Sequence, residues 1–476
     1  MDTMAIQLPL IDGDIVGTRI DRVIAAIHER IASRQLTPGA RLPSVRSAAK
    51  VMRVSVSTVV EAYDRLTAEG MIRSRPGAGF YVSAPLAPLT LTEIGPRLDR
   101  SIDPLWIARQ SLDAGEEMMR PGCGWLPPSW MPEAVLRRAL RAASRASAST
   151  LSEYASTLGL APLRALLARR LGERDIVASP DQILLTGSGT QAIDLVCRFL
   201  IEPGDTVLID DPCYFNFRAL LLAHRAKLVG VPFTPNGPDI ARFAEALTLH
   251  RPRLYITNSA IHNPTGASLS PVTAHQILKL AEPTGLTIVE DDIFADFETT
   301  PAPRFAAFDG LNQVVQVGSF SKTLSASVRC GFIAARADWI DKLADLQLAT
   351  QFGSPRLSAE LVHAMLKDGG YRRHAETVRD RLAGAMATSV ARLTAIGIKP
   401  WIVPKAGMFL WCRLPDGLDA ADVARRCLAQ GVVLAPGNAF SLSQQARGFL
   451  RFNVAQSLDQ RLIAVLEQAL CEACGP

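Results

Sequence analysis

A proline-spaced stretch, residues 85–116, separates two parts of this chain whose hydrophobic patterns differ. Four prolines, from Pro85 to Pro104, punctuate a sequence without sustained periodicity, which is typical of a linker. The part before it, residues 15–84, has the spacing of short amphipathic helices, and the part after it, residues 117–476, alternates strand-like and helix-like runs. Because 476 residues are too many for one ordinary domain, the pattern predicts two different folds joined by a linker.

Composition excludes several classes of protein. Hydrophobic residues make up 48% of the chain and charged residues 20%, as in globular proteins, and no apolar run is long enough to span a bilayer. The first residues lack the basic segment and apolar core of a signal peptide, so we expect a cytoplasmic protein. Cys471 and Cys474 form a C-x-x-C pair, but no second pair of metal-ligand spacing accompanies them, so no metal site is predicted.

Two short amphipathic helices are predicted between Leu42 and Gly70. Ser44 and Ser55 are suitable N-caps for them, because a serine hydroxyl can accept a hydrogen bond from a free backbone N–H group. In the second helix a single buried stripe falls at helical spacing, made by Val59, Ala62, Tyr63 and Leu66. Small hydroxyl residues then remain exposed at the helix N-terminus, where the helix dipole favours a phosphate group.

The segment after Gly70 is predicted to be a β-hairpin. Residues 71–75 and 80–82 are strand-like, and the glycines of the turn between them permit a close approach to another surface. Basic residues outnumber acidic ones across the module, which suits contacts with phosphate groups. The alternative is a helical pair with solvated charges, because helix–turn–helix geometry also occurs in proteins that do not bind DNA.

A family resemblance supports DNA binding. The winged helix–turn–helix of the GntR family is similar to about residues 16–84, which contain the stretch LPSVRSAAKVMRVSVSTVVEAYDRLTAEGMIRSRPGAGFYV. Position by position, the resemblance implies DNA contacts by Arg46, Ser55, Ser57, Thr58, Arg75 and Gly77. Val56 and Val60 stand where some members of the family have arginine, so the base-reading contacts of this chain do not follow from the resemblance.

Lys322 lies just after a predicted strand, Val314–Val317, and beside Ser319 and Ser321. A lysine that forms a Schiff base with a cofactor must be held near the site that anchors the cofactor's phosphate, and the two serines with Arg329 supply such a site. Taken alone the motif is weak, because a lysine beside serines is more often a solvated surface residue.

Four further segments support a cofactor site. Thr186–Gln191 joins a strand to a helix through small residues, an arrangement suited to a phosphate. Asp210–Tyr214 places an aromatic ring at a strand end, where the ring can stack on a flat heterocycle. Asn263–Gly266 presents an amide, although it can equally be only a turn. Ile288–Asp292 places a carboxylate after a buried strand, where it can keep a pyridine nitrogen protonated.

The order and spacing of these motifs resemble the fold-type I aminotransferases over roughly residues 117–470. The resemblance implies an α/β domain with a mostly parallel sheet, a smaller C-terminal subdomain, and pyridoxal phosphate bound covalently by Lys322. It also implies that Asp291 pairs with the pyridine nitrogen, Asn263 with the phenolic oxygen, and that Tyr214 stacks on the ring. The residues that would hold the phosphate are Gly189, Thr190, Ser319, Ser321 and Arg329.

The same resemblance implies contacts beyond the cofactor. Tyr154, in YASTLG, matches a tyrosine that reaches the phosphate of the neighbouring subunit, so a homodimer is expected. Arg451, in LRFNVA, matches the arginine that binds a substrate carboxylate. Relatives usually carry a tyrosine two or three residues after the aspartate, whereas this chain has Ile293 and Phe294 there, which weakens the expectation of efficient transamination.

A GntR-like head followed by an aminotransferase-like domain resembles the MocR regulators. That resemblance implies a pyridoxal phosphate-dependent transcriptional regulator that binds double-stranded operator DNA and senses an amino compound or the cofactor itself. One alternative is an aminotransferase with an accessory DNA-binding head, because a complete cofactor site fits both functions. Another is a regulator whose aminotransferase scaffold binds no cofactor.

Overall fold

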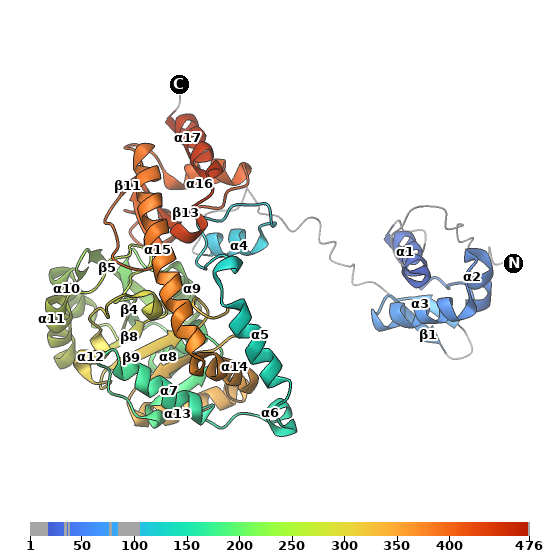
Figure 1. Ribbon diagram of the computed structural model, residues 1–476, viewed down its shortest axis with the longest axis horizontal. Helices are drawn as coiled ribbons and strands as arrows, with labels where there is room; N and C mark the ends of the chain where they lie inside the picture. Colours follow the sequence, from blue (N-terminus) through green and yellow to red (C-terminus); the bar gives the residue numbers. More distant parts are fainter. Residues whose placement is uncertain (1–17, 33–35, 37–38, 76–78, 84–104, 475–476) are drawn as a thin grey trace. The chain divides into compact units, whose positions relative to one another are not determined.

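The chain divides into two compact units, Met1–Glu93 and Ile94–Pro476. Each unit has a hydrophobic core of its own. The computed structural model describes residues 18–32, 36, 39–75, 79–83 and 105–474 (Figure 1).

The first unit is a winged helix–turn–helix, as predicted. Its elements are α1 (Arg19–Ala32), α2 (Val45–Met52), α3 (Val56–Ala68), and the antiparallel strands β1 (Ile72–Arg75) and β2 (Gly79–Val82). Both predicted serine caps are present, because the Ser44 Oγ accepts from the Ser47 N–H (3.2 Å) and the Ser55 Oγ accepts from the Thr58 N–H (3.1 Å). The caps fix the N-termini of α2 and α3.

The predicted stripe of α3 forms the centre of this unit's core. Val59, Ala62, Tyr63 and Leu66 are all fully buried. The Tyr63 hydroxyl donates to the carbonyl of Pro43 (3.0 Å), and its ring meets the Phe80 ring of β2 edge to face, with centroids 4.9 Å apart. The same side chain therefore fastens α3 both to the segment before α2 and to the hairpin.

The second unit is built on an eight-stranded sheet of order β3-β10-β9-β8-β7-β4-β5-β6. The strands are β3 (Ile183–Thr186), β4 (Thr206–Asp211), β5 (Lys227–Thr234), β6 (Gly237–Pro238), β7 (Leu254–Thr257), β8 (Thr287–Asp291), β9 (Val314–Ser319) and β10 (Gly331–Ala334). The neighbours β9, β8, β7, β4 and β5 run parallel, whereas β10 is antiparallel to both β3 and β9. The prediction of a mostly parallel sheet is confirmed.

Alternate side chains of the strands enter two cores, one on each face of the sheet. In β8, for example, Ile288 belongs to one core and Val289 to the other. The first face is covered by α5 (Glu133–Ala143), α7 (Ala161–Gly172), α10 (Ile240–His250), α11 (Pro271–Ala281), α12 (Phe305–Asp309) and α14 (Arg356–Lys367). The second face is covered by α8 (Gly189–Leu200), α9 (Phe215–Ala223) and α13 (Ala337–Gln351). Strands buried on both faces explain the near-continuous apolar runs of the sequence.

A smaller subdomain follows the long helix α15 (Gly369–Ala395), which begins against the large core and ends in the core of the subdomain. Its antiparallel sheet has the order β11-β12-β14-β13. The elements are β11 (Lys399–Pro400), β12 (Phe409–Arg413), β13 (Ala435–Pro436) and β14 (Phe449–Asn453), with helices α16 (Ala420–Ala429) and α17 (Arg461–Cys474). This is the predicted C-terminal subdomain.

Part of the segment interpreted as linker is folded. Residues Trp106–Asp113 form the helix α4, whose Trp106 and Ile107 are buried in the core of the small subdomain. The sequence predicted a linker up to residue 116 for two reasons. Prolines dominate the stretch before Trp106, and a helix as short as α4 is too short to show sustained hydrophobic periodicity. The rest of that segment, residues 85–104, lies outside the described residues.

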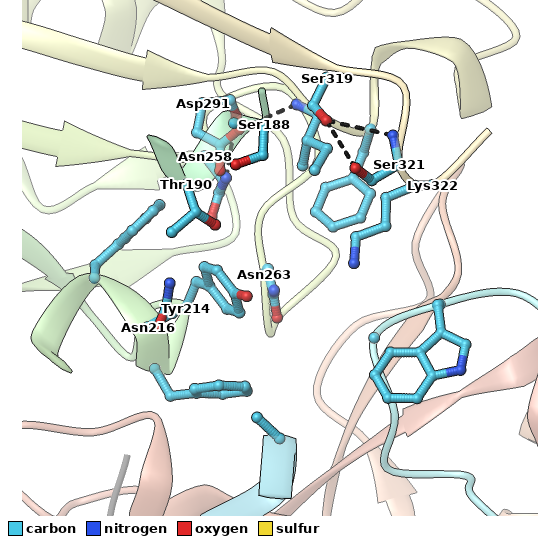
Figure 2. Close-up of a pocket in the computed structure, with 18 of the residues that line it drawn as sticks. Ser188, Thr190, Tyr214, Asn216, Asn258, Asn263, Asp291, Ser319, Ser321 and Lys322 are labelled. Atoms are coloured by element: carbon cyan, nitrogen blue, oxygen red, sulfur yellow. Dashed lines mark hydrogen bonds between the residues drawn. The ribbon is translucent and has the colours of Figure 1, made fainter. Parts of the chain in front are cut away.

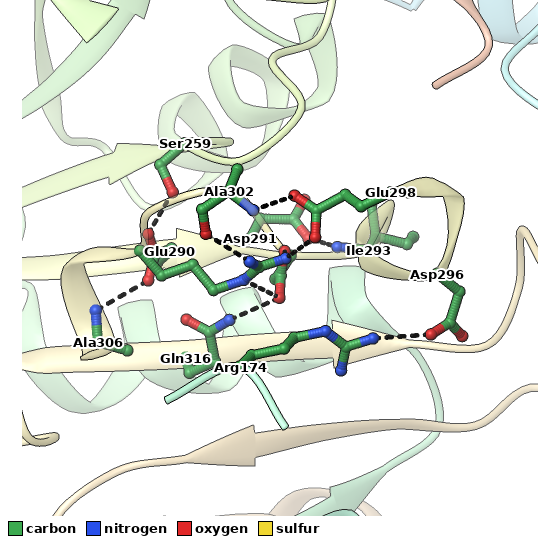
Figure 3. A network of polar contacts seen from close by, with 12 residues as sticks. Arg174, Ser259, Glu290, Asp291, Ile293, Asp296, Glu298, Ala302, Ala306 and Gln316 are labelled. Atoms are coloured by element: carbon green, nitrogen blue, oxygen red, sulfur yellow. Dashed lines mark hydrogen bonds and ion pairs between the residues drawn. The ribbon is translucent and has the colours of Figure 1, made fainter. Parts of the chain in front are cut away.

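A buried polar network fixes the end of β8, as Figure 3 shows. Glu290 accepts hydrogen bonds from the backbone N–H groups of Phe305 (2.8 Å) and Ala306 (3.0 Å). Arg304, which is fully buried, donates to Asp292 (2.8 Å) and to Glu298 (2.6 Å). Paired in this way, the carboxylates on either side of Asp291 hold the strand end in one position.

We predict that Arg304→Met destabilises the second unit. The substitution keeps most of the side-chain volume but leaves two buried carboxylates without their cation, which should lower the free energy of unfolding by about 3–5 kcal/mol. Urea denaturation followed by tryptophan fluorescence measures the loss. Arg137→Ala, which removes a solvent-exposed ion pair with Glu133, is the control and should leave the midpoint unchanged. An equally small effect of both substitutions would contradict the prediction.

Candidate functional site

A cavity of about 230 Å³ opens at the carboxyl ends of the parallel strands. Figure 2 shows side chains from several loops pointing into it. Ten of the predicted cofactor and effector residues line this cavity together: Gly189, Thr190, Tyr214, Asn263, Asp291, Ser319, Ser321, Lys322, Arg329 and Arg451. Residues far apart in the chain meet there because parallel strands deliver their following loops to the same edge of the sheet.

The end of the cavity beside α8 offers donors for an anion. Ser188 caps α8, its Oγ accepting from the Gln191 N–H (3.1 Å), and the first N–H groups of the helix have no intrahelical acceptor. The hydroxyls of Ser319 and Ser321 lie 3.1 Å apart. Gly189, the first residue of α8, lies against Ser319, since a Cβ added to it would be 3.4 Å from the Ser319 Cβ. Backbone N–H groups, hydroxyls and Arg329 together form a site suited to a phosphate.

Lys322 enters the cavity from the loop after β9. Burial lowers the pKa of its amine from 10.5 to about 8, and the cations Arg451 and Arg329 also lower it, while Cys123 and Asp291 act in the opposite direction. Near physiological pH an amine with this pKa is neutral in a far larger fraction than an ordinary lysine, and a neutral amine is the form that attacks a carbonyl.

Asp291 ends β8 with its side chain buried in the same cavity. Burial raises the pKa of this carboxyl from 3.8 to about 6. The backbone N–H of Ile293 donates to it (3.3 Å), and no lysine, arginine or histidine of the described residues forms an ion pair with it. A cationic N–H group placed opposite would satisfy this carboxylate.

Asn263 and Arg451 are bonded to each other. The Arg451 Nη1 donates to the Asn263 Oδ1 (2.8 Å) and its Nη2 to the carbonyl of Gly122 (2.7 Å). The guanidinium lies over the rings of Phe409 (4.2 Å) and Phe440 (4.9 Å), and burial lowers its pKa to about 10. With its oxygen engaged, Asn263 has its amide hydrogens left to donate into the cavity.

The remaining wall is aromatic and apolar. Tyr214 packs against Phe215 and Phe217, with ring centroids 4.9 and 5.4 Å apart. Burial raises the pKa of its hydroxyl to about 12, so it stays protonated. Ile293 and Phe294 also line the cavity, and neither side chain has a hydroxyl. Such a wall suits a flat ring held away from water.

Other predicted residues lie elsewhere. Tyr154 is 73% exposed, packs against the exposed Phe352 with ring centroids 4.8 Å apart, and does not line the cavity of its own chain. In the head, the exposed or partly exposed predicted DNA contacts are Arg46, Ser55, Ser57, Thr58 and Arg75. Gly77 lies outside the described residues.

Several lining residues were not predicted. Asn258 donates from its Nδ2 to the carbonyl of Asp291 (3.1 Å), and its position just after the apolar run of β7 is the signal that could have identified it. Trp125 and the α4 residues Ile107 and Ala108 have no such signal, because only the packing of the small subdomain brings them to the cavity. Of the described residues, no group of three His, Cys, Asp or Glu side chains could hold a metal ion.

The site fits pyridoxal phosphate. The donors beside α8 suit its phosphate, the buried carboxylate of Asp291 suits a protonated pyridine nitrogen, and the amide of Asn263 suits its phenolic oxygen. Lys322, whose depressed pKa favours the neutral amine, suits its aldehyde. Among the described residues, no cation forms an ion pair with Asp291. The protonated pyridine nitrogen of the cofactor would supply the positive charge that this buried carboxylate needs.

The pKa of Lys322 predicts a pH dependence for cofactor uptake. The amine is cationic below its pKa, so covalent attachment of pyridoxal phosphate to the stripped protein should accelerate as the pH rises and level off above about 8. With an ordinary lysine, whose pKa is about 10.4, the attachment rate would keep rising well above pH 8. Borohydride trapping at timed intervals, followed by mass spectrometry of the Lys322 peptide, measures the rate. A rate that still climbs steeply between pH 9 and 10 would contradict the prediction.

Comparisons with known proteins agree with this geometry. Residues 128–468 match the family model described as aminotransferase class I and II, and residues 19–82 match that described as bacterial regulatory proteins, gntR family. Among solved structures, α-aminoadipate aminotransferase LysN from Thermus thermophilus, complexed with N-(5'-phosphopyridoxyl)-L-leucine, is 28% identical, with a TM-score of 0.70 over 79% of this chain and 96% of that one.

Relatives that carry both parts are also similar along most of their length. The HTH-type transcriptional regulator YdcR of Escherichia coli is 30% identical, with 91% of this chain and 94% of YdcR aligned. The HTH-type transcriptional regulator YdfD of Bacillus subtilis is 28% identical, with 91% of this chain and 92% of YdfD aligned. The chain therefore belongs to the MocR-type regulators of the GntR family, in which a winged helix–turn–helix head is fused to an aminotransferase-like domain of fold type I.

Proposed function

We propose that this chain is a transcriptional regulator that binds operator DNA through its head and senses an amino compound, or pyridoxal phosphate itself, at Lys322. The observation that carries the proposal is the convergence of Lys322, Asp291 and Asn263 in one cavity of a chain that also has a winged helix–turn–helix. The cofactor is pyridoxal phosphate, as the aminotransferase domain and its phosphopyridoxyl-containing structural neighbour imply. When bound, it supplies an aldehyde that combines reversibly with amines.

Each residue of the site has a proposed task. Lys322 would hold the cofactor through its amine, whose low pKa favours the neutral, reactive form, and the amine of an effector would compete with it for the same aldehyde. Asp291 would keep a proton on the pyridine nitrogen, and Asn263 would donate to the phenolic oxygen. Arg451 binds a carboxylate of the effector through the hydrogens that Asn263 and Gly122 leave free.

The helix α4 is the proposed route of coupling. Ile107, Ala108 and Ser111 of α4 line the cavity, so a bound amine contacts this helix. Along the chain, α4 is the first described element after the head. An effector that favours one position of α4 over another would shift the equilibrium between arrangements of the two units, which is the requirement for allosteric coupling.

We further propose that the regulator is a homodimer that acts on DNA in the cytoplasm. The exposed pair Tyr154 and Phe352 offers an apolar contact surface, and a dimer would present two heads to a two-fold symmetric operator. In the part of the chain that the structure describes, no helix has both the length and the apolarity that crossing a bilayer requires.

Loss of the Lys322 amine should abolish the ligand response. Lys322→Ala is expected to bind DNA from the region upstream of this protein's own gene about as tightly as the wild type, within about threefold. It should respond to no added amino compound, because covalent capture of the amine is lost. Gel mobility shifts with pyridoxal phosphate and a panel of amino acids measure both properties. Lys342→Ala, an exposed lysine of α13, is the matched control. A complete response in Lys322→Ala would show that sensing does not pass through this residue.

An aminotransferase with a DNA-binding head is the second candidate function, favoured by the completeness of the cofactor site. Because Ile293 and Phe294 bring no hydroxyl, we expect turnover at least about 100-fold below the ~10 s⁻¹ typical of enzymes. Phe294→Tyr should raise it about tenfold by restoring a hydroxyl beside the cofactor. Transamination assays with amino acids and 2-oxo acids distinguish the two candidate functions. Wild-type rates comparable with those of true transaminases would favour the enzyme.

A further inference from the structure

Two valines on the outer face of α3 have no role in the core of the head. Val56 is 50% exposed and Val60 is 42% exposed, whereas the neighbouring Val59 is completely buried. They lie one helical turn apart, at positions i and i+4, so they form an exposed apolar strip along one side of the buried stripe. This valine strip, Val56 and Val60, is the feature that neither the fold nor the cofactor site explains.

The position of the valine strip is that of a base-reading surface. α3 is the second helix of the helix–turn–helix, and in this motif the N-terminal residues of the second helix contact base edges in the major groove. Val56 is the first residue of α3, directly after the capping Ser55. The hydroxyls of Ser57 and Thr58 lie beside the cap, within 2.9 and 2.7 Å of the Ser55 Oγ.

The charge of α2, the helix that precedes α3 in the motif, fits the same occupant. Arg46, Lys50 and Arg53, on α2 and the residue that follows it, are exposed, and no ion pair found in the described part of the head uses them. Exposed cations without carboxylate partners attract the phosphate backbone of DNA and position the helix on it. The charges thus favour a nucleic acid over an apolar protein partner as the occupant of the valine strip.

A valine in the major groove discriminates between bases by one property. It has no hydrogen-bond donor or acceptor, so it gains nothing from the polar groups that every base presents there and gains only from an apolar group. Thymine is the base that presents a methyl group in this groove, and apolar side chains read it by contact. We propose that Val56 and Val60 read the 5-methyl groups of thymines, so that each operator half-site carries thymine opposite the valine strip. This inference rests on the proposed DNA-binding function.

The test removes single methyl groups from the DNA. Duplexes are first selected from a random library by the full chain loaded with pyridoxal phosphate, and each thymine of the selected site is then replaced by uracil, which pairs identically but lacks the methyl. We expect one or two positions in each half-site at which uracil weakens binding about three- to fivefold, the effect of one buried methyl group. Uracil placed outside the selected site should have no effect.

Substitutions in the protein make the test specific. Val56→Ala and Val60→Ala should each bind thymine and uracil duplexes almost equally at the position that they read, whereas Val60→Thr, which keeps one methyl group, should retain part of the discrimination. Both valines are exposed, so the variants should fold normally, which thermal denaturation checks. Val177→Ala, in which an 82% exposed valine of the second unit is truncated, is the matched control and should discriminate like the wild type.

Three outcomes would overturn the proposal. Binding that changes less than twofold for uracil at every position shows that no methyl group is read. Full uracil sensitivity in the double variant Val56→Ala, Val60→Ala shows that other residues read it. Loss of self-association in the double variant, with DNA binding unchanged, assigns the strip to a protein contact. Failure of the chain to enrich any duplex sequence would refute sequence-specific DNA binding itself, and so differs from a failure of the thymine proposal alone.

Discussion

The common direction of β4, β7, β8 and β9 is the constraint on which the cofactor site depends. Because these strands run parallel, Asp291 at the end of β8 and the loops that carry Tyr214, Asn263 and Lys322 all lie at one edge of the sheet. A strand's side chains alternate between its faces, so a shift of one residue in β8 would exchange Asp291 with its neighbours. The network of Arg304 with Asp292 and Glu298, together with the hydrogen bonds to Glu290, opposes that shift.

Buried charge makes the cavity electrostatically incomplete by itself. Burial shifts the pKa of Lys322, Asp291 and Arg451 toward the neutral form in each case, which means that their charged forms are destabilised relative to water. A ligand that carries a phosphate at one end and a protonated ring nitrogen at the other supplies partners for such groups. In a structural core, these destabilised charges would only lower stability. In the cavity they favour a ligand that carries both positive and negative charge.

The two units rely on different physics. The head places exposed cations and an apolar strip, Val56 and Val60, on a small helical scaffold, a combination suited to a polyanion whose groove carries methyl groups. The second unit surrounds a small ligand with buried charges and aromatic rings. Joining the two units gives a chain with one surface suited to a small molecule and another suited to DNA. The two binding events can be coupled only if the small molecule binds one arrangement of the chain more tightly than another.

The sequence by itself determined the features that depend on near neighbours. The caps Ser44 and Ser55, the buried stripe of α3 and the cavity position of Lys322 were predictable, because capping and periodicity act over a few residues and parallel strands align their loops. Tertiary structure alone decided the rest: α4 folds within a proline-spaced stretch only because the small subdomain buries Trp106, and Arg451 bonds to Asn263 across 188 positions. The free energy of such contacts comes from packing between distant segments, which no local pattern records.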